Sequence, residues 1–253
     1  MNDTAQIITL LKTLKLSGIL ETLDLRLAEA QKNTLSFSEF LNSLLLDEIE
    51  TRNMNKLNRL IRNAHIGGIK TLETFDFSFN PSINASYIRE LAICRFIEKG
   101  ENIFFLGPTG TGKTHLAKAL CHQACRKHFP VLFFTAHELF KELANAEIND
   151  KIDKLMKKLI TVDLLAIDDF AFKKISQQSS EYLYSIVDRR YQIKSMIITS
   201  NRAITDWEAI FPDPVIANAI LDRLAHNAHQ IIIKGESYRK KMAPKLKSLD
   251  SKK

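Results

Sequence analysis

Apolar residues recur at helical spacing from the N-terminus to about residue 64. A first stripe ends at Ser17-Gly18, a second runs from Leu20 to Ala28, and a third follows Ser36-Phe37-Ser38-Glu39, which has the spacing of a capping box. Gly67-Gly68 ends the third stripe, as glycines do after helices. The pattern predicts a small all-α N-terminal domain over residues 1–70.

Turn-forming residues dominate the next segment. Asn80, Pro81, Ser82 and Asn84 predict a connector over residues 71–100. Within this connector we expect a helix from about Ser86 to Glu98.

Short apolar runs alternate with helical stretches over residues 101–235. The runs are near-continuous and rich in β-branched or aromatic residues, which is typical of buried parallel strands. The expected fold is therefore α/β, with a doubly wound, five-stranded parallel sheet. The runs are Ile103–Leu106, Val131–Phe134, Leu164–Ile167, Met196–Thr199 and Ile231–Ile233, and the predicted crossover helices include Thr114–Lys127, His137–Glu147 and Ser176–Gln192.

The first predicted strand leads into a phosphate-binding sequence. Residues 107–114 match the P-loop pattern G-x-x-x-x-G-K-[ST], and a plain glycine turn is the alternative. Glycines let main-chain N–H groups face phosphate oxygens, and the following helix presents its N-terminus to the same anion. Lys113 would contact the β- and γ-phosphates, and the Thr114 hydroxyl would bind Mg²⁺. The expected nucleotide-binding residues are Gly107, Pro108, Thr109, Gly110, Thr111, Gly112, Lys113, Thr114 and His115.

Acidic and amide side chains follow two other predicted strands. One strand runs into Asp168-Asp169 and another into Ser200-Asn201. Ligands of open α/β sheets lie at the carboxyl ends of strands. We therefore expect Asp168 to hold Mg²⁺ through a water, Asp169 to orient or polarise the attacking water, and Asn201 to reach the γ-phosphate or that water. A polar strand end without function is the alternative for each.

Composition and charge indicate the cell compartment and the kind of partner to expect. Cys94, Cys121 and Cys125 fit neither a disulfide framework nor a zinc spacing, which indicates a reducing compartment. The sequence shows no signal peptide and no apolar run of membrane-spanning length, so a cytoplasmic protein without a membrane partner is expected. The net charge of +7 favours a polyanionic partner, and residues 236–253 form a basic C-terminal tail.

Four cations of the N-terminal region share one predicted helix face. Arg52, Lys56, Arg59 and Arg62 follow one another at steps of four, three and three residues. Such a face suits the phosphate backbone of duplex DNA, and an ordinary solvated face is an equal alternative. The sequence has no base-reading motif, so DNA binding is expected to be nonspecific in sequence.

Together these segments resemble a known family. The P-loop, the Asp168-Asp169 strand end and Thr199-Ser200-Asn201 resemble Walker A, Walker B and sensor 1 of AAA+ ATPases. Val215–Leu224 and Ser237-Tyr238-Arg239 are similar to the arginine-finger and sensor-2 regions of the IstB/DnaC branch. The N-terminal region through Phe77 also resembles IstB-like proteins, which are transposition helper ATPases of insertion sequences.

The resemblance implies an ATPase that uses Mg²⁺, forms homo-oligomers with ATP sites between subunits, and engages duplex DNA and a transposase. Arg223 would reach the γ-phosphate of a neighbouring subunit, and Arg239 would sense the nucleotide in its own subunit; a surface or salt-bridging arginine is the alternative. Asp169 stands where many AAA+ proteins have glutamate, which implies slow hydrolysis, stimulated by DNA or oligomerisation. Few residues follow the last predicted strand, so the helical lid is expected to be reduced or absent.

Two other functions stay open from the sequence. A DnaC-like loader of a replicative helicase would share the ATPase core and differ in what its N-terminal region binds. A P-loop kinase of small molecules is disfavoured, because no acceptor site is evident and Arg223 indicates cooperation between subunits.

Overall fold

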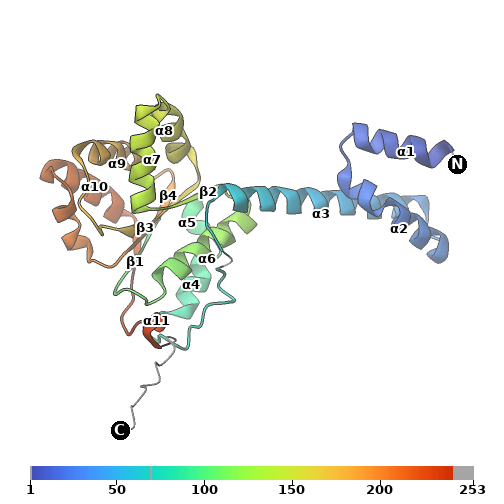
Figure 1. Cartoon of the computed structure of the whole chain (residues 1–253). Helices are drawn as coiled ribbons and strands as arrows, with labels where there is room; N and C mark the ends of the chain where they lie inside the picture. Colours follow the sequence, from blue (N-terminus) through green and yellow to red (C-terminus); the bar gives the residue numbers. More distant parts are fainter. Residues whose placement is uncertain (1, 69, 242–253) are drawn as a thin grey trace, which may run out of the picture. The chain divides into compact units, whose positions relative to one another are not determined.

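Residues 2–68 and 70–241 are described by the computed structural model of the chain (Figure 1). The chain divides into two compact units, Met1–Arg59 and Leu60–Lys253. Among the described residues, no helix is both long enough and apolar enough to cross a lipid bilayer.

The N-terminal unit is built from helices, as the hydrophobic pattern predicts. The capping box at the start of α3 is confirmed, because Ser36 Oγ accepts from Glu39 N at 3.3 Å and Glu39 Oε2 accepts from Ser36 N at 2.8 Å. Ile19, Leu23 and Leu44 form a small core. The helices are α1 (Asn2–Thr13), α2 (Ser17–Asn33) and α3 (Phe37–Asn63), whose last turn belongs to the second unit.

A buried carboxylate joins α2 to α3. Leu16, the residue before α2, provides no side-chain cap. Instead, Glu48 Oε2 accepts from the main-chain N–H groups of Gly18 and Ile19 at 2.7 and 3.2 Å. Glu48 is buried, and its other carboxylate oxygen accepts from Arg52 Nε at 2.6 Å. A tertiary contact thus supplies the helix cap that the local sequence lacks.

The second unit contains a five-stranded parallel sheet in the order β2-β3-β4-β1-β5, which confirms the predicted fold class. Every residue of β1 and of β4 is buried, so these two strands form the centre of the sheet. The strands are β1 (Asn102–Leu106), β2 (Val131–Thr135), β3 (Leu164–Phe170), β4 (Ser195–Ser200) and β5 (Ala228–Ile232).

Helices cover both faces of the sheet (Figure 1). On one face, α6 packs against β1, β2, β3 and β4. On the other, apolar residues of α7, α8, α9 and α10 share a core with alternate strand residues such as Phe104, Leu165 and Ile198. The bounds are α6 (Lys113–Arg126), α7 (Ala136–Ile148), α8 (Ile152–Thr161), α9 (Gln177–Arg190), α10 (Pro214–His226) and, after β5, α11 (Tyr238–Lys241).

Two predicted elements differ from the structure. The helix expected from Ser86 to Glu98 is two helices, α4 (Ala85–Leu91) and α5 (Arg95–Glu98), and the chain turns between them at Cys94, whose φ is 67°. The last strand begins at Ala228, three residues before the predicted Ile231. β5 is an edge strand that pairs only with β1, so its polar residues need not be buried and break the apolar run.

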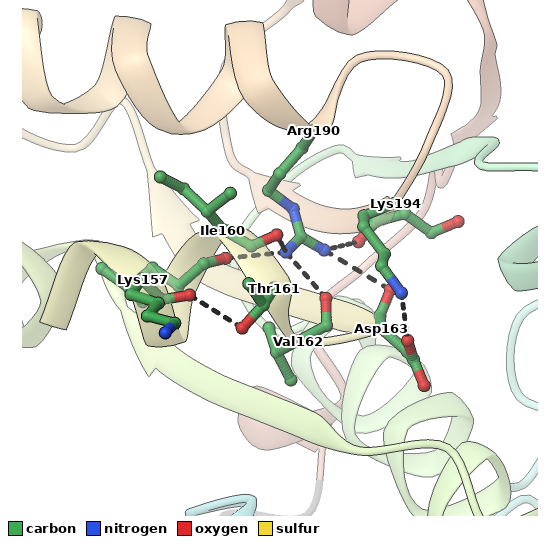
Figure 2. Close-up of polar contacts among 9 residues, drawn as sticks. Lys157, Ile160, Thr161, Val162, Asp163, Arg190 and Lys194 are labelled. Carbon is green, nitrogen blue, oxygen red and sulfur yellow. Dashed lines mark hydrogen bonds and ion pairs between the residues drawn. The ribbon is translucent and has the colours of Figure 1, made fainter. Parts of the chain in front are cut away.

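A buried arginine fixes the starts of β3 and β4 (Figure 2). Arg190, the last residue of α9, is 1% exposed. Several of its carbonyl partners belong to the C-terminal turn of α8, where they have no partner within the helix. Arg190 therefore ties α8, β3 and β4 together. Its guanidinium donates to the main-chain oxygens of Leu159 (2.7 Å), Ile160 (3.2 Å), Val162 (2.8 Å), Asp163 (3.4 Å) and Ser195 (2.6 Å).

Candidate nucleotide-binding site

The P-loop connects β1 to α6 and lies against the chain that follows β5. Gly107 has a φ of 142°, and a Cβ there would lie 2.0 Å from the carbonyl oxygen of Ile233. Gly110 has a φ of 84°, and a Cβ there would lie 2.1 Å from Ser237 Oγ. The Gly110 carbonyl accepts from Tyr238 N at 2.9 Å. Both the backbone conformation and the close approach of the C-terminal segment therefore require glycine at these positions.

The side chain of Lys113 lies inside the loop that precedes it. Lys113 is 5% exposed, and its Nζ donates to the carbonyl oxygens of Gly107 and Pro108, both at 2.7 Å. Burial lowers the pKa of Lys113, and the negative charges of Asp169 and Asp168 oppose that effect. The ammonium group is thus held against the main chain at the start of the loop.

Two hydroxyl groups converge on the first acid of β3. Thr114 Oγ1 and Thr199 Oγ1 both donate to Asp168 Oδ1, at 2.9 and 2.5 Å. Asp168 is 4% exposed. Burial raises the pKa of Asp168, and the hydrogen bond from Thr199 opposes the rise. The structure therefore brings the two expected Mg²⁺ ligands, Thr114 and Asp168, side by side as oxygen donors of the kind that Mg²⁺ prefers.

Asp169 and Asn201 line a second cavity next to the P-loop. Asp169 is exposed and borders two cavities, one beside Lys113 and a second of about 570 Å³ that Asn201 also lines. Thr109 of the P-loop borders both cavities. The two side chains expected to handle water thus share a space next to the P-loop.

Three chain segments enclose the P-loop cavity, which measures about 580 Å³. Besides the P-loop, they are the connector, which contributes Phe75, Phe79 and Asn80, and the segment after β5, which contributes Tyr238 and the expected Arg239. Asn80 Nδ2 donates to the carbonyl oxygen of Lys234 at 2.7 Å, so the connector and the C-terminal segment hold one another.

Aromatic side chains that had no expected role from the sequence also line this cavity. The rings of Phe79 and Tyr238 meet edge to face with centroids 4.8 Å apart. Phe75, Phe77 and Phe79 alternate within a turn-rich connector, and that spacing is the one signal that marked them. Their place at the P-loop depends on a contact across about thirty residues of sequence, which periodicity does not report.

His115 borders the cavity with its ring turned to the connector. His115 Nε2 lies 3.0 Å from the carbonyl oxygen of Thr71 and 3.3 Å from Thr74 Oγ1. Burial lowers the pKa of His115. The ring therefore supports the wall of the cavity, and its contact with nucleotide stays a prediction.

Arg223 is not among the residues that line either cavity. Its Nε lies 3.1 Å from Asp188 Oδ1, its Nη1 donates to the carbonyl oxygen of Ala219 at 2.9 Å, and its guanidinium lies 5.4 Å from the ring of Tyr184. The side chain is 28% exposed. A role for Arg223 at the P-loop of a neighbouring subunit stays a prediction.

The four cations expected to face DNA all lie exposed along α3. Arg52 forms an ion pair with Glu48. Within residues 2–68 and 70–241, no ion pair involves Lys56, Arg59 or Arg62. Most of the predicted basic tail, residues 242–253, lies outside the described residues.

Relatives of this chain occur in insertion sequences. The chain is 38% identical over 235 residues to a protein of Mycobacterium tuberculosis described as an ATP-binding protein in an insertion sequence, covering 92% of this chain and 94% of the relative. It is 39% identical over 210 residues to the protein of Geobacillus stearothermophilus described as the ATP-binding protein of insertion sequence IS5376, covering 83% and 84% of the two chains.

The fold is shared with solved proteins of DNA replication. The crystal structure of the DnaC helicase loader matches with a TM-score of 0.54 at 24% identity, over 68% of this chain and 97% of that chain. The model of one protein family, described as IstB-like ATP binding protein, matches residues 9–246. With its P-loop, its strand-end acid and these full-length relatives, the chain belongs to the family of IstB-like ATP-binding proteins.

Proposed function

We propose that the protein is an ATPase that binds duplex DNA and assists transposition by recruiting or activating a transposase. The observation that carries the proposal is the P-loop cavity, which Lys113 and Thr114 line, with the buried Asp168 hydrogen-bonded to Thr114, in a chain of this family. The relatives named above are described as ATP-binding proteins of insertion sequences, which supports the assignment to transposition.

The cavity fits an adenine nucleotide. Its volume of about 580 Å³ lies within the range of small-molecule sites. The P-loop amides and Lys113 would hold the phosphates in place of the carbonyl contacts that Lys113 now makes. Phe75, Phe79 and Tyr238 line the same cavity and offer aromatic surface to the base, and Arg239 adds a positive charge.

Thr114 and Asp168 also fit Mg²⁺. Their oxygens lie 2.9 Å apart, and Asp168 is the buried acid of β3. When bound, Mg²⁺ neutralises phosphate charge that develops during transfer of the γ-phosphoryl group. Asp168 would hold the ion through a water, and Thr114 would bind it with its hydroxyl.

Hydrolysis would use the exposed acid next in sequence. Asp169 would accept a hydrogen bond from a water molecule whose oxygen attacks the γ-phosphorus, while the bond from that phosphorus to the bridging oxygen breaks; ADP and inorganic phosphate leave, and the phosphate carries the protons of the water. Asn201 would orient the same water or the γ-phosphate from the shared cavity. Aspartate reaches one methylene less far than glutamate, so slow turnover is expected until DNA or a neighbouring subunit completes the site.

Assembly and DNA binding involve other surfaces. Arg223 would leave its contact with Asp188 and supply positive charge to the ATP site of the next subunit. Lys56, Arg59 and Arg62 would contact phosphates of duplex DNA without reading bases. The N-terminal unit also exposes large apolar side chains, among them Leu14, Phe37 and Leu41, which suits contact with a protein partner.

ATPase activity and particle size test the enzyme and its assembly. Wild type, Lys113→Ala and Arg223→Ala would be measured with and without duplex DNA of scrambled sequence, with Arg189→Ala as an exposed arginine control on α9. Lys113→Ala should lose nucleotide binding. Arg223→Ala should bind ATP and lose DNA-stimulated hydrolysis, whereas Arg189→Ala should behave as wild type. Normal hydrolysis by a monomeric Arg223→Ala protein would refute the intersubunit site.

DNA titration tests the basic face of α3. Removing Lys56, Arg59 and Arg62 together should weaken ATP-dependent DNA binding and lower the salt slope by about 0.9 for each phosphate that the protein no longer neutralises. Replacing the exposed Lys154, Lys157 and Lys158 of α8 by alanine removes the same charge and serves as the control. Equal, negligible DNA binding with and without ATP would remove DNA from the proposal.

A DnaC-like helicase loader is the second candidate function, favoured by the shared fold with the DnaC loader. Pull-down with a replicative helicase and with a transposase encoded beside this chain separates the two. Capture of the helicase alone would favour the loader.

A further inference from the structure

The two acids of β3 lie in an irregularity of the sheet. In the pairing of β3 with β4, Ile167 is opposite Ile198 and Phe170 is opposite Ser200. Two residues of β3, Asp168 and Asp169, therefore face one residue of β4, which is Thr199. This arrangement is a β-bulge, and bulges next to functional sites redirect side chains.

A single hydroxyl group spans the bulge. Thr199 Oγ1 donates to Asp168 Oδ1 at 2.5 Å and accepts from the main-chain N–H of Asp169 at 3.0 Å. Thr199 is 1% exposed. In a regular parallel ladder the main-chain N–H groups of one strand pair with carbonyl oxygens of its neighbour. Here the threonine hydroxyl takes that place for Asp169 and holds the side chain of Asp168 at the same time.

The backbone of Asp169 has an uncommon conformation. Its φ is 54°, in the left-handed region that side chains other than glycine, asparagine and aspartate rarely adopt. With the bulge, Asp168 is buried against Thr114 while Asp169 is exposed at the two cavities beside the P-loop.

We propose that Thr199 is a positioning residue that aligns both acids through its hydroxyl, fixing Asp168 as a metal ligand and Asp169 toward the attacking water. The role rests on the proposed ATPase function. It differs from that expected for Asn201, which lies two residues later and borders the second cavity. Thr199 itself lines neither cavity, and its hydroxyl bonds both acids, so the proposed effect on ATP and Mg²⁺ passes through them.

The test compares Thr199→Val with Thr199→Ser. Valine keeps the shape and removes the hydroxyl, and serine keeps the hydroxyl. Ser200→Ala is the matched control, because the Ser200 hydroxyl is buried on the same strand and bonds Phe170 O and Trp207 Nε1 but neither acid. Each protein is titrated with a non-hydrolysable ATP analogue with and without Mg²⁺, and kcat and KM for ATP are measured with Mg²⁺.

Thr199→Val should bind the analogue without Mg²⁺ as wild type does, and should lose about 10- to 100-fold of the affinity gained from Mg²⁺. Its kcat should fall by about tenfold or more with a smaller change in KM. Thr199→Ser should restore both, and Ser200→Ala should leave the Mg²⁺ effect unchanged. Fluorescence of Trp207 checks folding, and Thr199→Ala replaces the valine variant in the same comparison if valine prevents folding.

A Thr199→Val or Thr199→Ala protein that keeps the wild-type Mg²⁺ effect and kcat would overturn the role of Thr199 and leave the proposed ATPase intact. An equal loss in Ser200→Ala would also overturn it, because the effect would then follow from any damage to β4. Failure of the wild type to bind the analogue at all would instead remove the ATPase proposal.

Discussion

Replacing Arg190 by methionine should destabilise the second unit, which contains the sheet, through main-chain groups that the substitution cannot remove. Methionine keeps most of the side-chain volume, so the principal loss is hydrogen bonding. Three bonds from the guanidinium, to the carbonyl oxygens of Leu159, Val162 and Ser195, are 2.8 Å or shorter (Figure 2). A buried carbonyl left without a partner costs about 1 kcal/mol or more, so three cost about 3 kcal/mol.

Removal of a buried charge works in the opposite direction. Burial lowers the pKa of Arg190 to about 9, which reflects the cost of taking its charge out of water. Methionine removes that cost, as apolar replacements of buried ions often do. The carbonyl oxygens remain buried, however, at the end of α8 and the starts of two strands, and the two longer bonds to Ile160 and Asp163 also disappear. We therefore expect a net loss of about 3 kcal/mol.

Urea unfolding followed by fluorescence of Trp207 measures this loss. Trp207 is the one tryptophan of the chain and is fully buried in the second unit. With a slope of about 3 kcal/mol per M, the midpoint should fall by about 1 M. Arg189→Met, at the exposed neighbouring position, should change stability by less than about 0.5 kcal/mol. An Arg190→Met midpoint equal to that of Arg189→Met would refute the reasoning.

Three further predictions concern other contacts. Glu48→Ala should destabilise the N-terminal unit by about 2 kcal/mol, because two N-terminal amides of α2 lose their acceptor. Hydrogen exchange of the α2 amides measures this loss of stability. An effect no larger than that of Glu50→Ala, at an exposed position, would contradict the prediction. Hydrogen bonding to an arginine lowers the pKa of Asp47 to about 2 from 3.8, so its stabilisation is present above pH 4 and lost as pH falls toward 2. The difference in α2 protection between wild type and Asp47→Asn should therefore shrink over that range, and a constant difference would refute the linkage. Gly110→Ala should weaken binding of an ATP analogue by about tenfold or more, because its Cβ would collide with Ser237; wild-type affinity by calorimetry would show that the C-terminal segment moves away freely.

Local patterns were sufficient for the P-loop and for most of the sheet. Residues 107–114 identify the P-loop from the sequence alone, because a phosphate-binding loop needs glycines and a lysine at fixed spacing. The central strands could also be predicted from the sequence, because a strand that is buried on both faces of the sheet needs a continuous run of apolar residues. The start of the edge strand β5 was predicted three residues too late, because the first residues of this strand are not buried and can be polar.

Contacts between segments that are distant in the sequence could not be predicted from the hydrophobic periodicity. Nothing local marks Glu48 as the cap of α2, Arg190 as the partner of five carbonyl oxygens, or the connector aromatic residues as walls of the P-loop cavity. Each depends on which elements the fold places together. A single buried polar side chain leaves no repeat in the pattern of apolar and polar residues. Its one hydrogen-bond partner can lie anywhere in the sequence.

The sequence by itself determined that a P-loop precedes a helix in a parallel α/β sheet, and that two acids lie at the end of another strand. Only the tertiary structure shows the bulge opposite Thr199, at which Asp168 is buried and Asp169 is exposed. Side-chain direction at a strand end depends on register with the adjacent strand, and register is a property of two segments at once.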